Sequence, residues 1–266
     1  METGLDGAIV LVTGGVRGVG AGISRAFLQA GATVVTCARR PADDPIEWVA
    51  PDGTSHGVEY VPCDIRDPEQ VHAMIGGIMQ MHGRLDVLVN NAGGAPFALA
   101  ADASAKFHSK IVELNLLAPL LVSQAANAIM QEQESGGAIV NISSVSGSRP
   151  SPGTAAYGAA KAGVDSLTTS LAVEWAPKVR VNAVVVGLVE TELAHLHYGD
   201  ESGVAAVGET IPLGRMARPA DIGNSAVFLA SSLAEYVSGS TLTVHGGGER
   251  PAFLAASTSD TNKENS

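Results

Sequence analysis

Residues 8–20 read A-I-V-L-V-T-G-G-V-R-G-V-G, a short apolar run that leads directly into a glycine-rich turn. The run Ala8–Val12 is apolar at every position, which is typical of a strand covered on both faces. Glycines let the backbone approach a ligand closely, and a helix that starts in such a turn points N–H groups at phosphate oxygens. A plain turn without a ligand is the alternative. The position between a first strand and a first helix favours a Rossmann-type nucleotide site.

The rest of the chain continues the alternation of short β-branched runs and longer helical patterns. We expect strands at 8–12, 32–36, 58–62, 86–89, 138–142, 179–185 and 241–244, and helices at 19–30, 68–81, 103–133, 155–175 and 220–231. This order predicts an α/β fold, a doubly wound parallel sheet of about seven strands with helices on both faces. No repeat or shift in composition divides the chain. We therefore expect one catalytic domain over residues 1–252 and a disordered polar tail at 253–266.

Composition narrows the possible partners. The 266 residues are 45% hydrophobic, and 16 basic against 27 acidic residues give a net charge of −11. Nucleic acid and anionic membrane are poor partners for such a surface. Cys37 and Cys63 lie in apolar runs and are expected to be buried free thiols of a reducing compartment. Without a predicted signal peptide or an apolar run of 18 residues, we expect a cytoplasmic protein.

The end of the second expected strand indicates the choice of cofactor. It reads V-V-T-C-A-R-R at 34–40, so the acidic residue that would hold the ribose 2′-hydroxyl of NAD is absent. Arg39 stands near that place, and Arg17 in the glycine loop could bind the same 2′-phosphate through charge-assisted hydrogen bonds. The alternative is that both arginines are solvated surface residues. The pattern favours NADP(H) over NAD(H).

Further cofactor contacts are expected where the next strands end. Asp64, followed by Ile65, could accept a hydrogen bond from an adenine amino group. Asn91, Ala92 and Gly93 follow the fourth strand, where small residues let the backbone approach a cofactor.

A tyrosine and a lysine stand four positions apart in T-A-A-Y-G-A-A-K-A-G at 154–163. Positions i and i+4 share one face of a helix, so Tyr157 and Lys161 can point into one site. A tyrosine with a pKa near ~10 exchanges protons poorly at neutral pH unless a neighbour helps it, and a nearby ammonium lowers its pKa. The pair alone is a common coincidence.

Six motifs in order make the chain resemble the short-chain dehydrogenase/reductase family, in its compact single-domain branch. The resemblance covers about residues 5–248. Within the family, the chain is similar to 3-oxoacyl-thioester reductases. The motifs are T-G-x3-G-x-G at 13–20, N-N-A-G at 90–93, Asn115, N-I-S-S at 141–144, Y-x3-K at 157–161 and P-L-G-R at 212–215. The resemblance implies an oxidoreductase that moves a hydride between a nicotinamide and a ketone or secondary alcohol.

The resemblance places a catalytic tetrad on Asn115, Ser144, Tyr157 and Lys161. Tyr157 would be the general acid/base, Lys161 would make it usable, and Ser144 would polarise the substrate oxygen. Ser143 is the competing serine, but the family register favours the second of the two. Because Pro119 lacks an N–H, the carbonyl of Asn115 loses its helical partner and could hold a water that leads to Lys161. A proline kink without a role is the alternative.

The resemblance also assigns cofactor contacts, with two departures from the family pattern. Val186 stands where the family usually has proline, and His245 where it usually has aspartate, near a subunit interface. The expected cofactor residues from the motifs are Gly14, Gly18, Val19, Gly20, Tyr157, Lys161, Gly187, Val189 and Thr191. The family further implies a homotetramer, or a homodimer, built on helices 103–133 and 155–175 and on the C-terminal strand.

The clustered histidines do not predict a metal site. His195 and His197 lie near Asp200 and Glu201 in the segment 192–211, which resembles a mobile substrate lid and would be a poor metal cage. Residues expected to line the pocket are Gly94–Phe97, Ser146–Thr154, Leu193, Leu196, His197 and Tyr198. They suit a hydrophobic ketone or alcohol, such as a 3-oxoacyl thioester or a cyclic ketone.

Three other functions remain as alternatives. One is an NAD-dependent alcohol dehydrogenase of the same family. A second is a non-catalytic nucleotide-binding regulator, which would be expected to lack Ser144, Tyr157 or Lys161, although all three are present. A third is a nucleotide-sugar epimerase, whose glycines are spaced G-x-x-G-x-x-G rather than as Gly18-x-Gly20.

Overall fold

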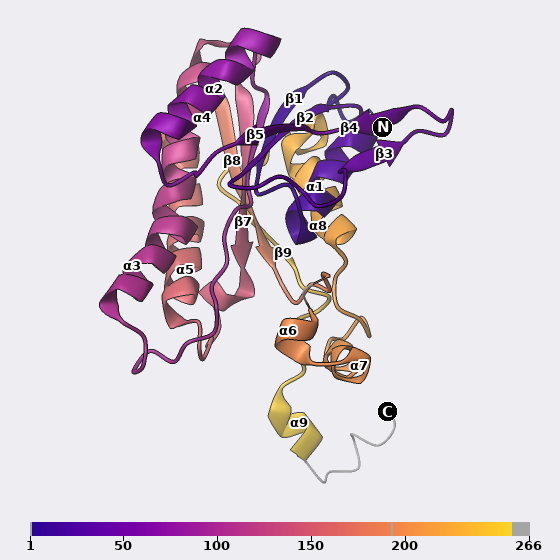
Figure 1. Cartoon of the computed structure of the whole chain (residues 1–266), viewed down its shortest axis with the longest axis vertical. Coiled ribbons are helices and arrows are strands. Elements are labelled where there is room, and N and C mark those ends of the chain that lie inside the picture. The colour runs from indigo at the N-terminus through magenta and orange to yellow at the C-terminus, as the bar shows by residue number, and fades with distance from the viewer. Residues whose placement is uncertain (1, 193, 257–266) are drawn as a thin grey trace.

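The computed structural model describes residues 2–192 and 194–256, and its centre is a seven-stranded parallel sheet (Figure 1). The strands lie in the order β5-β2-β1-β6-β7-β8-β9. Their bounds are β1 Ile9–Thr13, β2 Thr33–Ala38, β5 Glu59–Pro62, β6 Val87–Asn90, β7 Gly137–Ser144, β8 Val179–Val186 and β9 Thr241–Val244. The doubly wound α/β fold predicted from the sequence is confirmed, and each expected strand lies within two residues of its predicted bounds.

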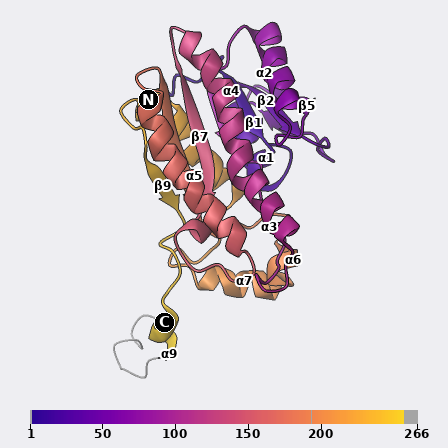
Figure 2. The ribbon, with the colours of Figure 1, turned by 90° about the vertical axis from the view of Figure 1, so that its left-hand side faces the viewer.

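Helices cover both faces of the sheet, as the two views of the ribbon show (Figures 1 and 2). On one face lie α1 (Gly18–Gln29) and α8 (Pro219–Ala230). On the other lie α2 (Pro68–His82), α4 (Ala118–Glu132) and α5 (Ala155–Glu174). The carboxyl ends of the strands point toward the end of the molecule that carries the shorter helices.

Alternation along β1 divides the core into two layers. Ile9 and Leu11 belong to the layer under α2, α4 and α5, whereas Val10 and Val12 belong to the layer under α1 and α8. All five residues of this strand are buried, which explains why the sequence shows a continuous apolar run rather than alternating polarity.

Two glycines bring α1 and α8 into backbone contact. A Cβ added to Gly22 would lie 2.4 Å from the Cβ of Pro219, and one added to Gly223 would lie 2.7 Å from the carbonyl oxygen of Gly22. No larger residue fits this crossing without moving a helix. The crossing therefore fixes α1, and with it the glycine turn, against the sheet.

Several short elements were not predicted from the sequence. The strands β3 (Glu47–Val49) and β4 (Ser55–Gly57) form an antiparallel hairpin in which Trp48 stacks on His56 at 5.7 Å between ring centroids. The expected lid forms two short helices at the carboxyl end of the sheet (Figure 2). The short elements there are α6 (His195–Tyr198), α7 (Glu201–Glu209) and α9 (Ala252–Ala256), while most of the expected tail, 257–266, lies outside the described residues.

The long helix expected at 103–133 contains a π-helical turn. It consists of α3 (Ala105–Val112), the turn η1 (Glu113–Leu117) and α4. By length and composition alone, the described stretch Ala105–Glu132 could cross a membrane. Its inner face instead packs in the core of this layered fold, where Val122 and Ala126 are fully buried.

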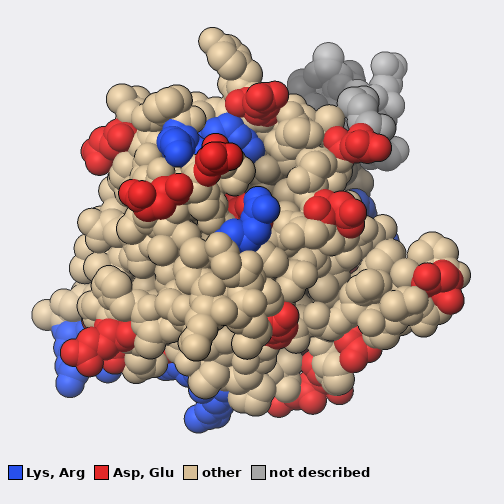
Figure 3. All heavy atoms as spheres, turned by 90° about the horizontal axis from the view of Figure 1, so that it is seen from above, with Lys and Arg blue, Asp and Glu red and all other residues tan. Residues whose placement is uncertain are grey.

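Charges are mixed on the face seen in Figure 3, at the end of the molecule opposite α6 and α7. Lysine and arginine side chains lie there among aspartate and glutamate side chains rather than in one basic field. This distribution agrees with the net charge of −11.

Candidate active site

The glycine-rich turn that joins β1 to the start of α1, residues 14–20, exposes backbone that glycines leave without side chains, and we call this turn the cradle. Gly14 and Gly18 have φ angles of +66° and +51°, which favour glycine. A Cβ added to Gly20 would lie 2.1 Å from the carbonyl oxygen of Gly14. The Asn91 side chain holds the turn from β6, because its Nδ2 donates to the carbonyl oxygens of Thr13 (2.9 Å) and Gly14 (3.1 Å). Asn91, expected as a cofactor contact, thus also fixes the backbone of the glycine turn.

An anionic group is already bound at this cradle. The backbone N–H of Gly18, at the start of α1, donates to Oε1 of Glu192 at 3.0 Å. Arg17, the N-cap residue, offers no side-chain cap, and the first turn of α1 contains no acidic residue. A carboxylate on this N–H shows that the helix start accepts an anionic oxygen, so the residues present fit the pyrophosphate of a dinucleotide.

The arginines predicted to select the cofactor lie at the carboxyl ends of β1 and β2. Arg17 and Arg39 are both exposed. The Asp64 carboxylate accepts two hydrogen bonds from the Arg66 side chain, at 2.9 and 2.6 Å. These bonds, with smaller contributions from the charge of Arg66 and then of Arg39, lower the pKa of Asp64 below its ordinary value. Because Arg66 occupies the carboxylate, an adenine amino group would have to share it.

Other expected cofactor residues differ in how far they are buried and in how close they lie to the glycine turn. The Ile65 side chain is buried in the core, so only its backbone is available to a ligand, whereas Val19 is partly buried against the opposite layer. Thr191 lies beside the glycine turn, since a Cβ on Gly18 would come within 3.6 Å of its Cγ2.

The segment after β8 joins neighbouring elements at the same end of the sheet. Val189 forms a β-bridge with Ala217. A Cβ on Gly187 would lie 2.6 Å from the Cβ of His245, so the residue that replaces the usual aspartate packs directly on this segment.

Tyr157 and Ser144 meet at the start of α5. Tyr157 stands on the first turn of that helix, and Ser144 ends β7, where its hydroxyl also accepts from the backbone N–H of Ser146 at 3.2 Å. Burial raises the pKa of Tyr157, and a hydrogen bond with Ser144 lowers it in part. The sequence predicted that Lys161 would lower this pKa, and that prediction is wrong in its direction: the pKa of Tyr157 is raised, because burial outweighs the hydrogen bond with Ser144.

Lys161 is buried one turn further along α5, with 4% of its surface exposed. Its Nζ donates to the carbonyl oxygen of Ile142 at 2.7 Å and lies 5.6 Å from the centre of the Tyr157 ring. Burial lowers the pKa of Lys161 to about 8, and the charge of Asp165 opposes that decrease. The lysine is therefore a cation near neutral pH but close to losing its proton.

Asn115 lies in the π-helical turn and is fully buried. Its Oδ1 accepts from the N–H of Gly94 at 2.7 Å, and its Nδ2 donates to the carbonyl of Gly94 at 3.0 Å. A Cβ on Gly93 would lie 2.6 Å from Asn115 Oδ1 and 3.6 Å from Lys161 Nζ. The side chain of Asn115 thus orders the loop after β6 beside the lysine, and π-turns often occur at functional sites.

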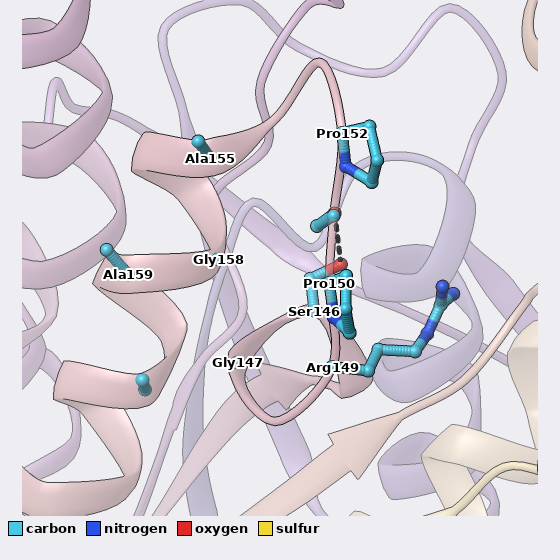
Figure 4. Close-up of a pocket in the computed structure, with 10 residues that line it drawn as sticks. Ser146, Gly147, Arg149, Pro150, Pro152, Ala155, Gly158 and Ala159 are labelled. Carbon is cyan, nitrogen blue, oxygen red and sulfur yellow. Dashed lines mark hydrogen bonds between the residues drawn. The ribbon is translucent and has the colours of Figure 1, made fainter. Parts of the chain in front are cut away.

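A pocket of about 400 Å³ lies beside this group, between the loop after β7 and α5 (Figure 4). The ten described residues that line it include Gly158 and Ala162 but neither Tyr157 nor Lys161. Figure 4 shows Arg149 extending away from α5, and its guanidinium pairs with the Glu249 carboxylate at 2.7 Å. This pair ties the loop after β7 to the segment after β9.

The outer wall of the expected substrate site is apolar. Phe97 is 71% exposed as a residue, and its ring covers Gly153, where an added Cβ would lie 2.0 Å from a ring carbon. The backbone N–H of Ala98 donates to the carbonyl of Gly153 at 2.8 Å, which joins the loops after β6 and β7. Of the expected lid residues, Leu193 and the side chains of Leu196 and His197 lie outside the described part of the structure.

Four residues near the site were missed by reasoning from sequence. Asp165 lies four positions after Lys161, a spacing that could have indicated it. Arg66 lies two positions after Asp64. Glu192 and Glu249 gave no local signal, because their partners lie 174 residues away in one case and 100 in the other (249 − 149).

Comparison with known proteins agrees with this geometry. A family model described as enoyl-(acyl carrier protein) reductase matches residues 14–249. A 3alpha-hydroxysteroid dehydrogenase of Mediterraneibacter gnavus is 37% identical over 248 residues, which cover 91% of this chain and 97% of that protein. The human protein called dehydrogenase/reductase SDR family member 4 is 32% identical over 247 residues, 91% of this chain and 88% of that one.

A solved structure shares the fold. The ligand-free aldohexose dehydrogenase of Thermoplasma acidophilum matches with a TM-score of 0.83 and 30% identity, over 91% of this chain and 94% of that one. The chain therefore belongs to the short-chain dehydrogenase/reductase family of oxidoreductases, which use a nicotinamide cofactor.

Proposed function

We propose that the protein is an NADP(H)-dependent oxidoreductase that interconverts a hydrophobic ketone and its secondary alcohol. The observation that carries the proposal is the grouping of Ser144, Tyr157 and Lys161 at the carboxyl end of the sheet, beside a cradle that accepts an anion. When bound, the nicotinamide supplies the hydride in reduction and accepts it in oxidation.

Tyr157 is the proton donor or acceptor in this proposal. In reduction its hydroxyl gives a proton to the carbonyl oxygen, and in oxidation its phenolate takes one from the alcohol. The hydroxyl of Ser144, which contacts Tyr157, is placed to donate to the same substrate oxygen. The positive charge of the Lys161 ammonium stabilises the Tyr157 phenolate. The lysine is also proposed to pass protons between Tyr157 and the solvent.

The relay from Lys161 toward solvent is supported by the position of Asn115. Its side chain fixes the loop that carries Gly93 and Gly94, and Gly93 separates it from the lysine. Asn115 is therefore proposed to position the loop and the lysine, with its carbonyl as the place for a bridging water.

The choice of NADP(H) rests on charge at the end of β2. Ala38 is followed by the exposed Arg39, and Arg17 stands exposed at the glycine turn. The charge of Arg39 contributes to the lowered pKa of Asp64, which supports a place for the adenine ribose beside these two residues. A 2′-phosphate would receive charge-assisted hydrogen bonds there.

A free or coenzyme A-linked hydrophobic substrate fits this chain better than one carried on an acidic protein. Arg149, on the loop after β7, is paired with Glu249, so its charge is already matched by a carboxylate of this chain. Exposed Phe97 and Leu99 supply apolar surface near the expected site. The similarity to a 3alpha-hydroxysteroid dehydrogenase supports a cyclic ketone within that class.

We further propose that the protein is a homotetramer. The outward side of α5 carries small residues, alanine, serine and threonine, and an 80% exposed Val173, and these would let a second copy pack closely against the helix. Light scattering is expected to give four times the chain mass, and a stable monomer would overturn this assignment.

The first experiment is a fluorescence titration of the purified protein with NADPH and NADH, followed by a ketone panel with the tighter cofactor. Tight NADPH, weak NADH and turnover of cyclic ketones would agree with the proposal. Preference for NADH would favour an NAD-dependent alcohol dehydrogenase, and binding without turnover by any substrate class would favour the regulator.

A further inference from the structure

The lid segment contacts the glycine turn through a carboxylate bound to a backbone N–H group. Glu192 follows Thr191 after β8, and its exposed carboxylate accepts the N–H of Gly18 at 3.0 Å. The two residues are 174 positions apart, so the fold, not the local sequence, brings them together.

This contact fills a gap that the sequence leaves at the start of α1. Most helices satisfy their first N–H groups with a Ser, Thr, Asp or Asn side chain at the N-cap. The N-cap of α1 is Arg17, which provides no side-chain acceptor, and no acidic residue lies in the first turn. The 12-residue helix therefore presents uncapped N–H groups, and the carboxylate of Glu192 takes one of them.

We propose that Glu192 is a displaceable anion that occupies the pyrophosphate position of the glycine turn and thereby sets the affinity for the cofactor. This inference rests on the proposed cofactor-binding function. A pyrophosphate and a carboxylate require the same N–H, and their like charges repel one another at close range. Binding of the dinucleotide therefore requires Glu192 to leave, and the lost contact reduces the measured affinity.

The backbone of Thr191 and Glu192 is joined to the lid through short-range contacts. The N–H of Ala194 donates to the carbonyl of Thr191 at 2.9 Å, and Nδ1 of His195 lies 3.1 Å from the carbonyl oxygen of Glu192. His195 begins α6, so the backbone of Glu192 is joined to the start of that helix.

Isothermal titration calorimetry tests the proposal on the full chain with three probes: NADPH, ADP-ribose, which contains the pyrophosphate, and adenosine 2′-monophosphate, which lacks it. We expect Glu192→Ala to bind NADPH and ADP-ribose about three- to tenfold more tightly, because an exposed charged contact is of modest strength. Glu192→Gln, which loses the charge but keeps an acceptor, should show a smaller gain. Adenosine 2′-monophosphate should bind all variants alike.

Glu190→Ala is the matched control, because Glu190 is exposed, lies two positions earlier and carries the same charge. Equal effects of Glu190→Ala and Glu192→Ala, or a gain for adenosine 2′-monophosphate as well, would overturn the proposal in favour of a general charge effect. A lower melting temperature for Glu192→Ala with unchanged affinities would show that the contact only caps the helix. If the wild type bound NADPH and NADH in no measurable amount, the proposed function itself would fail.

Discussion

The ammonium of Lys161 lies 5.6 Å from the centre of the Tyr157 ring, one helical turn away, and hydrogen bonds to the carbonyl of Ile142 on the neighbouring strand. The lysine is thus fixed from the sheet while it faces the tyrosine from the helix. Removal of the tyrosine hydroxyl should therefore leave the lysine and the cradle in place. Tyr157→Phe is expected to reduce turnover at least ~100-fold, because general acid/base catalysis contributes that much or more.

Two measurements check this first prediction. Steady-state turnover with the best ketone of the panel reports the loss, and NADPH fluorescence reports binding, which should change by less than about twofold. Retained turnover would remove Tyr157 from the proposed role. A parallel loss of NADPH binding would indicate that the phenylalanine disturbs the cradle.

A second prediction concerns the free energy of unfolding, which the buried charge of Lys161 lowers. Burial lowers its pKa to about 8 from the ordinary 10.5. Between these values the unfolded chain binds more protons than the folded chain, so the folded state gains stability as the pH rises. Below pH 8 the buried charge carries its full cost. Lys161→Met should therefore be more stable than wild type at pH 7, by about 2 kcal/mol after allowing for the lost hydrogen bond.

Urea unfolding at pH 7 and at pH 10 tests this sign. The stability advantage of Lys161→Met should shrink at pH 10, where the folded wild type holds a neutral lysine. A variant that is less stable than wild type at pH 7 would contradict the prediction, and a difference independent of pH would show that packing, not charge, is responsible.

The third prediction concerns cofactor choice. Arg39→Asp replaces a guanidinium with a carboxylate at the end of β2, so a 2′-phosphate would lose a hydrogen bond and meet a repulsive charge. We expect NADPH to bind at least about tenfold more weakly and NADH to change little. Arg40→Asp, with the same change of charge one position later, is the control. Equal weakening of both cofactors by Arg39→Asp would exclude the 2′-phosphate role.

The fourth prediction uses two glycines in helices with opposite surroundings. Gly22 faces the backbone of Pro219, where an added Cβ would lie 2.5 Å from the carbonyl carbon, whereas a Cβ at Gly77 meets no atom within 4 Å. Gly22→Ala should destabilise the protein by about 2 kcal/mol or more. Gly77→Ala should stabilise it by about 0.5–1 kcal/mol, because alanine favours the helix. Denaturant midpoints of both variants give the comparison, and similar values would contradict the close crossing of α1 and α8.

Sequence patterns predicted the parts of the fold that depend on local composition. The inner strands β1 and β6 are buried along their whole length because both faces of the sheet are covered there, whereas the edge strands β5 and β9 are partly exposed. The hairpin Glu47–Gly57 was missed because its two strands have three residues each and are mostly exposed. The π-helical turn itself was not predicted, because its sequence E-L-N-L-L is compatible with an ordinary helix, although Pro119 indicated an interruption of the helical hydrogen bonds at Asn115.

The candidate site likewise contains residues that the sequence predicted and contacts that it did not. The spacing of Tyr157 and Lys161 indicates one face of a helix, and family motifs indicated Ser144 and Asn115. The bonds of Asn115 to Gly94 and of Glu192 to Gly18 depend on tertiary packing, which no local pattern contains. Burial also decided the pKa of Tyr157, and the depth of a side chain could not be deduced from its neighbours in the sequence.

The crossing of α1 over α8 has a consequence for how substrate range can change among relatives. Backbone packed on backbone has no rotamers to exchange, so the nucleotide half of the molecule tolerates little substitution at Gly22 and Gly223. The segment 194–211, by contrast, consists of short helices joined by exposed residues. New substrate preferences are therefore expected to arise by replacement of lid residues, while the position of the glycine turn stays constant.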